Sequence, residues 1–199
     1  MNYRAAWQDA DLEMFRDSVR KFAAAEYAPH DKAFREQQYV DKSFWLKAGE
    51  MGLLCIDIPE EYGGSGLPIS AAAAILETIH HAGSNAAACH AQMYTMGTVL
   101  RHGSEQQKQQ YLPAIADGSL RLQAFGVTEP GSGTDTTALR TTARRDGDDY
   151  VVNGQKIWTS RAEHSDLMVL LCRTTARDQV EKKTDGLSVL LVDMRDCDE

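Results

Sequence analysis

The sequence predicts an α+β protein: an all-helical N-terminal domain over residues 1–118, followed by an incomplete antiparallel β-domain over residues 119–199. Three observations lead to this prediction. Before residue 118, apolar residues recur every three or four positions, as on one face of an amphipathic helix. Glycine and proline divide that region into segments of helical length. Beyond residue 120 the period shortens, and Asp146-Gly147-Asp148-Asp149 lies between two β-rich segments, which is typical of a hairpin.

The helical domain begins with an amphipathic segment whose apolar positions are Leu12, Phe15, Val19, Phe22, Ala23 and Tyr27. Pro29 is expected to end this helix, because proline lacks the N–H that a helix interior needs. A second helix is expected from Asp41 to Met51, with Gly52 beyond its end. The apolar run from Leu53 to Ile58 is expected to be buried. The glycine-rich run from Pro59 to Gly66 is expected to be a loop.

Three more helices complete the domain. Pro68, at the favoured first turn, begins one that extends to about His81. The Gly83-Ser84-Asn85 break precedes another from Ala86 to His102. Ser104 with Gln107 has the form of a capping box, which predicts a polar helix to about Ala116, closed by Gly118.

In the β-domain, the segments from Leu139 to Arg145 and from Tyr150 to Val152 are expected to form a hairpin. A second turn is expected at Asn153-Gly154. The apolar runs Leu167 to Cys172 and Leu187 to Val192 predict buried strands. The charged segment between them, Arg173 to Gly186, is expected to be an exposed loop.

Charge and composition exclude several classes of protein. The formal net charge is −8, and no block of Lys or Arg is present, which argues against a nucleic-acid partner. No apolar run approaches the ~20 residues of a membrane helix, so no membrane insertion is expected. The N-terminus resembles neither a signal nor a transit peptide, so a cytoplasmic location is expected. The four cysteines have no CxxC spacing and are expected to be reduced thiols. The overall negative charge does not exclude a local cationic pocket that binds a small phosphorylated ligand.

The segment from Ala124 to Asp135 is the first candidate for chemistry. It follows an expected strand, two glycines bracket Ser132, and hydroxyl residues stand at 128, 132 and 134. Such a loop can turn several backbone N–H groups toward one anion or polar ring edge. The simpler interpretation of this segment alone is a β-turn, because Pro-Gly and Ser-Gly are dipeptides that favour turns.

The second candidate is the segment from Asn153 to Ser160. Trp158 could lay its aromatic face on a planar ligand, and Ser160 could donate a hydrogen bond to that ligand. The simpler alternative is a Trp in the core beside strand hydroxyl residues.

Four motifs, taken in order, resemble the acyl-CoA dehydrogenase family of flavoproteins. They are the loop Pro59–Gly66, the helix motif His102–Pro113, the loop Val127–Asp135 and the segment Asn153–Ser160. The resemblance covers essentially the whole chain. It implies an N-terminal helical domain, a middle β-domain and a C-terminal helical bundle, with FAD between the last two. A departure is Arg161-Ala162, where many family members carry Asn-Gly.

The resemblance also implies the site residues. Phe125, Val127 and Thr128 would meet the flavin ring. Gly133 and Thr134 would border its phosphate-bearing chain, and Thr134 would also touch the acyl-CoA. Trp158 would flank the flavin, with Thr159 and Ser160 providing polar contacts near its reactive edge. Donors there stabilise the negative charge that a reduced flavin gains.

The family reaction removes an α-proton from an acyl-CoA thioester and transfers the β-hydrogen to FAD as hydride, which yields a trans-2-enoyl-CoA. The base is a glutamate of the C-terminal bundle, expected beyond Glu199, so no residue of this chain is assigned as catalytic. The resemblance further implies an electron-transferring flavoprotein as partner and a homo-oligomer when the protein is full length. Two alternatives remain: an acyl-CoA oxidase or flavin monooxygenase on the same scaffold, and a truncated, non-catalytic assembly module.

Two other groups of residues have simpler interpretations. His80 and His81 point about 100° apart on a helix, and His90 lies beyond a break, so no metal site is predicted. The run from Glu163 to Asp166 contains the residue types of a catalytic triad, but sequence neighbours rarely aim at one point. It is expected to be a solvated loop.

Overall fold

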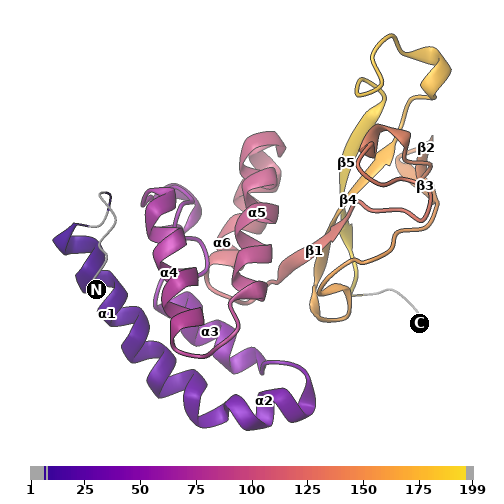
Figure 1. The fold of residues 1–199 in the computed structure, drawn as a ribbon. Coiled ribbons are helices and arrows are strands. Elements are labelled where there is room, and N and C mark those ends of the chain that lie inside the picture. Colours follow the sequence, from indigo (N-terminus) through magenta and orange to yellow (C-terminus); the bar gives the residue numbers. More distant parts are fainter. Residues whose placement is uncertain (1–6, 8, 196–199) are drawn as a thin grey trace. The chain divides into compact units, whose positions relative to one another are not determined.

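A computed structural model describes residue 7 and residues 9–195 of the chain (Figure 1). The chain divides between Arg121 and Leu122 into two units. The α+β class is confirmed, because helices make up the first unit and a small sheet makes up the second.

The helical unit contains six α-helices among its described residues. They are α1 (Ala10–Phe22), α2 (Asp31–Gln37), α3 (Lys42–Glu50), α4 (Ile69–His81), α5 (Ala87–His102) and α6 (Glu105–Ala116). All the predicted helices are present. The run from Leu53 to Ile58 is buried as predicted, except at the half-buried Asp57.

The expectation that Pro29 ends the helical path is wrong. After α1 the chain passes through a π-helical turn, Ala23–Tyr27, and a 3₁₀ turn, Ala28–His30, and then enters α2. Pro29 lies at the start of the short 3₁₀ turn, where a missing N–H removes no essential hydrogen bond. The helical path therefore continues past Pro29 into α2.

Two tertiary contacts secure the helices. Arg16 of α1 donates to Glu77 of α4 at 2.5 Å, and the Arg16 side chain is only 10% exposed. Gly118 adopts a φ of +81°, and a Cβ there would collide with the backbone of Trp45. The chain can therefore leave α6 toward the sheet only with glycine at this position.

The N-terminus of α6 has the capping box that the sequence predicts. The Gln107 N–H donates to Ser104 Oγ at 3.2 Å, and the Ser104 N–H donates to Gln107 Oε1 at 2.9 Å. Two helix-terminal donors are thereby satisfied.

The sheet has five strands among the described residues: β1 (Leu122–Gly126), β2 (Thr142–Asp146), β3 (Asp149–Asn153), β4 (Leu167–Arg173) and β5 (Leu187–Asp193). Their order is β1-β4-β2-β3, and β5 also pairs with β4. The β2–β3 and β4–β5 pairs are antiparallel, as predicted. However, β1–β4 and the single β2–β4 residue pair are parallel, so the sheet is mixed. The long connection from β1 to β4 allows the parallel return.

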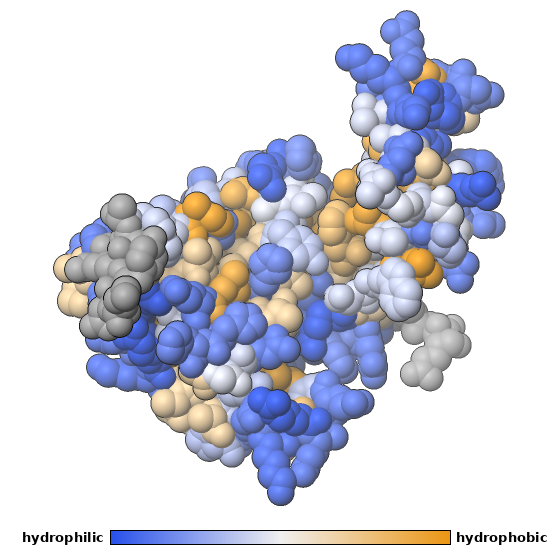
Figure 2. Space-filling model, in the orientation of Figure 1, coloured by the Kyte–Doolittle hydropathy of each residue, from blue (hydrophilic) through white to orange (hydrophobic). Residues whose placement is uncertain are grey.

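Burial differs between the strands. β4 is largely buried, as predicted, whereas β5 is only half-buried, which corrects the expectation of a second buried strand. Every residue of β3 is exposed, whereas β1, at the other end of the strand order, is largely buried. Polar residues cover much of the surface in view, with scattered apolar side chains between them (Figure 2).

Two further expectations concern cysteines and membranes. Cys55, Cys89 and Cys172 are buried free thiols, and Cys197 lies outside the described residues. In the described part of the chain, no helix is both long and apolar enough to cross a membrane.

Candidate flavin and phosphate site

Both candidate segments lie in the sheet unit, and the structure brings parts of them together. β1 ends at Gly126 and delivers Val127 and Thr128 to its end. The Ile157 N–H donates to the Thr128 carbonyl at 2.9 Å. This bond places the residue before Trp158 directly beside Thr128, so two segments about 30 residues apart lie side by side.

The predicted site residues are all accessible. Phe125, Val127 and Thr159 are half-buried, and the other five, Thr128, Gly133, Thr134, Trp158 and Ser160, are exposed. Trp158 is 85% exposed, so the alternative of a core tryptophan is wrong. Its φ of +59° is unusual for a bulky residue, and such strain costs of order 1–3 kcal/mol. Strained backbone conformations cluster at active sites and ligand-binding sites, so the strain at Trp158 supports a functional role for this segment.

Gly133 and Thr134 lie further along the first segment. A Cβ added at Gly131 or Gly133 would meet nothing within 4 Å, so the backbone is uncovered there. No described hydrogen bond joins Gly133 or Thr134 to the segment from Trp158 to Ser160. The structure therefore brings together Thr128 and the residue before Trp158, and it leaves the backbone at Gly133 open.

Glu129 and Lys156 form a buried ion pair between the two segments. Lys156 Nζ lies 2.9 Å from Glu129 Oε1, with side-chain exposures of 10% and 5%. Burial alone would raise the pKa of Glu129, but hydrogen bonds from Thr141, Arg140 and Lys156 lower it to about 2. The carboxylate is therefore ionised at neutral pH and accepts hydrogen bonds through both oxygens, and with so low a pKa it is a poor general base.

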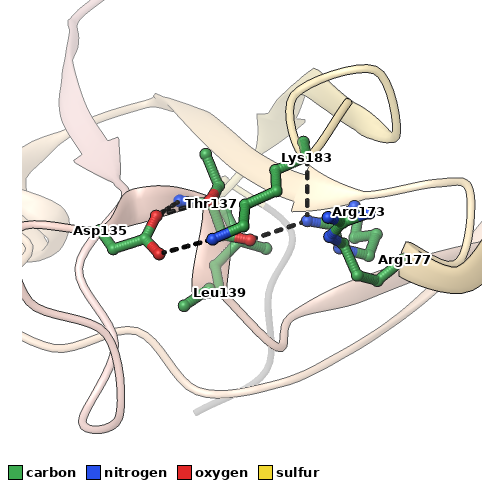
Figure 3. Close-up of a pocket in the computed structure, with 7 residues that line it drawn as sticks. Asp135, Thr137, Leu139, Arg173, Arg177 and Lys183 are labelled. Atoms are coloured by element: carbon green, nitrogen blue, oxygen red, sulfur yellow. Dashed lines mark hydrogen bonds and ion pairs between the residues drawn. The ribbon is translucent and has the colours of Figure 1, made fainter. Parts of the chain in front are cut away.

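A cationic pocket begins directly after Thr134 (Figure 3). Its volume is about 290 Å³, and it is lined by Asp135, Thr137, Ala138, Leu139, Arg173, Arg177 and Lys183. Three cations face one carboxylate, so the pocket is positive. Lys183 Nζ lies 3.6 Å from Asp135 Oδ2. A hydrogen bond from Thr137 and the charge of Lys183 lower the pKa of Asp135.

Arg173 is the pocket residue that the sequence interpretation missed. It was expected at the start of an exposed loop, but it ends β4 and is 7% exposed. Its Nη2 donates to the carbonyls of Thr137 and Lys183 at 2.9 and 3.4 Å. Its Nη1 is buried without a hydrogen-bond partner among the described residues. The only sequence signal was its position at the end of an apolar run.

The second expected turn, at Asn153-Gly154, does not form a hairpin. β3 ends at Asn153, no strand follows before β4, and Gly154 does not have a positive φ. Glycine is needed there for another reason: a Cβ on Gly154 would collide with Thr141. The chain thus passes close against the entry to β2 before it reaches Trp158.

The expectation that Glu163 to Asp166 is a solvated loop is wrong at Ser165. Ser165 is 7% exposed, and its Oγ accepts from the N–H groups of Gln123 and Ala124 at 2.8 and 3.1 Å. The same hydroxyl donates to the Leu167 carbonyl at 2.6 Å. Ser165 bridges the irregular part of the β1–β4 pairing and is not a nucleophile.

Among the described residues, no cluster of three His, Cys, Asp or Glu side chains could hold a metal ion.

Arg161, the departure from the family pattern, adopts a φ of +66° and donates through Nε to the buried Gln123 side chain at 3.2 Å. Arg161 thus adopts the left-handed conformation that Asn adopts more readily.

Comparison with known families decides the identity of the scaffold. The model of the acyl-CoA dehydrogenase N-terminal domain matches residues 9–119, and that of the acyl-CoA dehydrogenase middle domain matches residues 124–198. The chain belongs to the acyl-CoA dehydrogenase family. Members of this family are oxidoreductases that act on CH–CH donors.

Individual acyl-CoA dehydrogenases agree with the family match. The pig mitochondrial long-chain specific acyl-CoA dehydrogenase is 33% identical over 187 residues, which cover 92% of this chain and 42% of that protein. The crystal structure of an acyl-CoA dehydrogenase from Geobacillus kaustophilus superposes with a TM-score of 0.87 at 33% identity, over 96% of this chain and 50% of that one.

A glutaryl-CoA dehydrogenase from Mycobacterium smegmatis, solved in complex with FADH2, gives a TM-score of 0.82 at 26% identity, over 94% of this chain and 46% of that one. The chain therefore spans about half the length of the acyl-CoA dehydrogenases it matches.

Proposed function

We propose that this chain forms the flavin-facing surface, and part of the substrate-facing surface, of a FAD-dependent enzyme that introduces an α,β double bond into an acyl-CoA thioester. The observation that carries the proposal is the hydrogen bond that places Thr128 beside the residue preceding Trp158. It joins the two segments for which a flavin contact was predicted, and the exposed tryptophan stands at their junction.

The accessible residues fit a planar, anionic cofactor. Trp158 offers an aromatic face, and Thr128, Thr159 and Ser160 offer hydroxyl donors beside it. Phe125 and Val127 would contact the ring. The uncovered backbone at Gly133 and Thr134 would border the phosphate-bearing chain, and Thr134 would also touch the acyl-CoA. The FADH2 complex of the M. smegmatis relative supports FAD as the cofactor.

The cationic pocket beside Thr134 supports phosphate-bearing ligands, because FAD and acyl-CoA both carry phosphate groups. Arg173, Arg177 and Lys183 supply positive charge there within an otherwise acidic chain. Arg and Lys bind phosphate by charge-assisted hydrogen bonds.

The chain's own contribution to catalysis is positioning. FAD supplies the hydride acceptor. Hydroxyl and backbone donors of the site would stabilise the negative charge that develops on reduction. No described residue of the site is a suitable base, since Glu129 is engaged in its ion pair. We propose that a glutamate outside this chain removes the α-proton, that an electron-transferring flavoprotein accepts the electrons, and that the full-length protein self-associates.

The first experiment is to incubate the purified chain with FAD, desalt it and record its absorbance spectrum. We expect retained flavin absorbance. Trp158→Leu should weaken FAD binding by up to about tenfold, since a stacked aromatic is worth ~0.5–1.5 kcal/mol. The control is Tyr150→Leu, because Tyr150 is 46% exposed on β3, outside the site. Absent flavin in the wild-type chain, or equal retention by Trp158→Leu, would overturn the proposed site.

A further inference from the structure

Glu129 and Lys156 each make further hydrogen bonds in addition to the ion pair between them. Besides the carboxylate, Lys156 Nζ contacts the Val127 carbonyl at 3.0 Å. The next residue, Ile157, donates its N–H to the next carbonyl, that of Thr128. Two consecutive residues of one candidate segment thus hold two consecutive carbonyls of the other.

The carboxylate of Glu129 makes a third connection. Its Oε2 accepts from the Arg140 N–H at 2.6 Å, and its Oε1 accepts from the Thr141 N–H at 2.9 Å. Both donors lie just before β2. Glu129 therefore attaches the first candidate segment to the sheet, while Lys156 attaches the second segment to the first. We call this arrangement the Glu129–Lys156 clasp.

Stability alone does not account for a buried ion pair. Removing two charges from water is costly, and apolar residues of similar volume often stabilise a core as well or better. An ion pair whose two members each make further hydrogen bonds instead fixes geometry, because each donor and acceptor accepts only a narrow range of positions.

The geometry that this clasp fixes includes a strained residue. Trp158 follows Ile157 directly and has a positive φ. Such a backbone persists only where its surroundings hold it. The hydrogen bond from Ile157 and the ion pair of Lys156 are the contacts immediately before the strained position.

We propose that Glu129 and Lys156 are positioning residues for the flavin. The clasp sets the spacing between the Val127–Thr128 backbone and Trp158, and it acts through those groups without touching the cofactor. This inference rests on the proposed function, since it assigns a role within that site.

The test compares Lys156→Met with Lys156→Arg and with Lys182→Met, a change at an exposed lysine of the same unit. FAD affinity, the position of the flavin absorbance bands and hydrogen exchange at the Ile157 amide are measured. We expect Lys156→Met to weaken FAD binding tenfold or more, shift the bands and speed exchange at Ile157. Lys156→Arg should recover most of the affinity, and Lys182→Met should match the wild type.

A double variant separates positioning from folding. Lys156→Met leaves a buried, partly uncompensated carboxylate, so loss of FAD could follow from poor folding. Glu129→Gln combined with Lys156→Met removes that charge. A positioning role predicts that the double variant regains stability but still binds FAD at least tenfold more weakly, with shifted bands. Recovery of wild-type affinity and spectrum would overturn the proposal and leave a purely structural ion pair.

The outcomes also separate this inference from the proposed function. If the wild-type chain binds no FAD, the proposed function fails, and the flavin role of the clasp fails with it. If the wild type binds FAD and both the single and double variants bind it equally well, only the clasp proposal fails.

Discussion

Glu129 illustrates at the scale of one residue how a carboxylate stays ionised when buried. Its side chain is 5% exposed, yet two backbone N–H groups and the Lys156 ammonium group surround it. These donors favour the charged form more strongly than burial disfavours it. The same contacts remove Glu129 from consideration as the catalytic base, although it is the glutamate of the most distinctive motif in the chain.

A pH dependence of stability follows from this residue. The folded-state pKa of Glu129 is about 2, below its ordinary value of 4.5. Its stabilising contribution is therefore present above the unfolded-state pKa and is lost as the pH falls from about 4.5 toward 2. The contribution amounts to at most about 3 kcal/mol.

Denaturant unfolding at pH 7, 4 and 3 measures this contribution. The wild type should lose more stability than Glu129→Gln over that range, because glutamine does not titrate. Parallel losses in the two proteins would show that other carboxylates govern the acid sensitivity.

At the scale of one element, the segment after β3 is shaped by close packing and not by a turn. Asn153-Gly154 has the sequence of a tight hairpin turn, but no partner strand follows. The glycine instead lets the backbone approach Thr141, where a Cβ would collide. The route of this segment toward Trp158 depends on that approach.

Gly154→Ala should therefore destabilise the protein by about 1–3 kcal/mol, the usual effect of overpacking. The matched control is Gly131→Ala, because a Cβ at Gly131 meets nothing within 4 Å. Urea unfolding measures both variants. Equal stability of the two would contradict the close approach at Thr141.

At the scale of the whole molecule, the chain consists of two units, and every predicted flavin contact lies in the second. A ligand that binds only the native state stabilises the part that it contacts. FAD should therefore protect the sheet unit selectively.

Hydrogen exchange with and without FAD tests this selectivity. At a FAD concentration 100 times Kd, exchange that depends on opening the site should slow by up to about 100-fold in residues 124–128 and 156–160. Amides in α1 and α4 should change little. Slowing in those helices without slowing at the site would place the flavin elsewhere.

Features of local origin could be predicted from the sequence by itself. These features depend on residues only a few positions apart: they are the capping box of Ser104, the β2–β3 hairpin and the helices bounded by glycine. Their hydrogen bonds and backbone preferences are already present in the sequence pattern. The order of four motifs likewise predicted the family, because motif residues are read directly from the sequence.

Only the tertiary structure decided the features that join distant residues. Three features depend on tertiary packing: the passage of the helical path through Pro29, the parallel β1–β4 pairing and the burial of Arg173. The Glu129–Lys156 clasp connects residues 27 positions apart. Sequence periodicity carries no information about such pairs, since the position of each partner is set by the folding of everything between them. The candidate residues were thus determined by the sequence, whereas their arrangement around Trp158 was decided by long-range hydrogen bonds and packing.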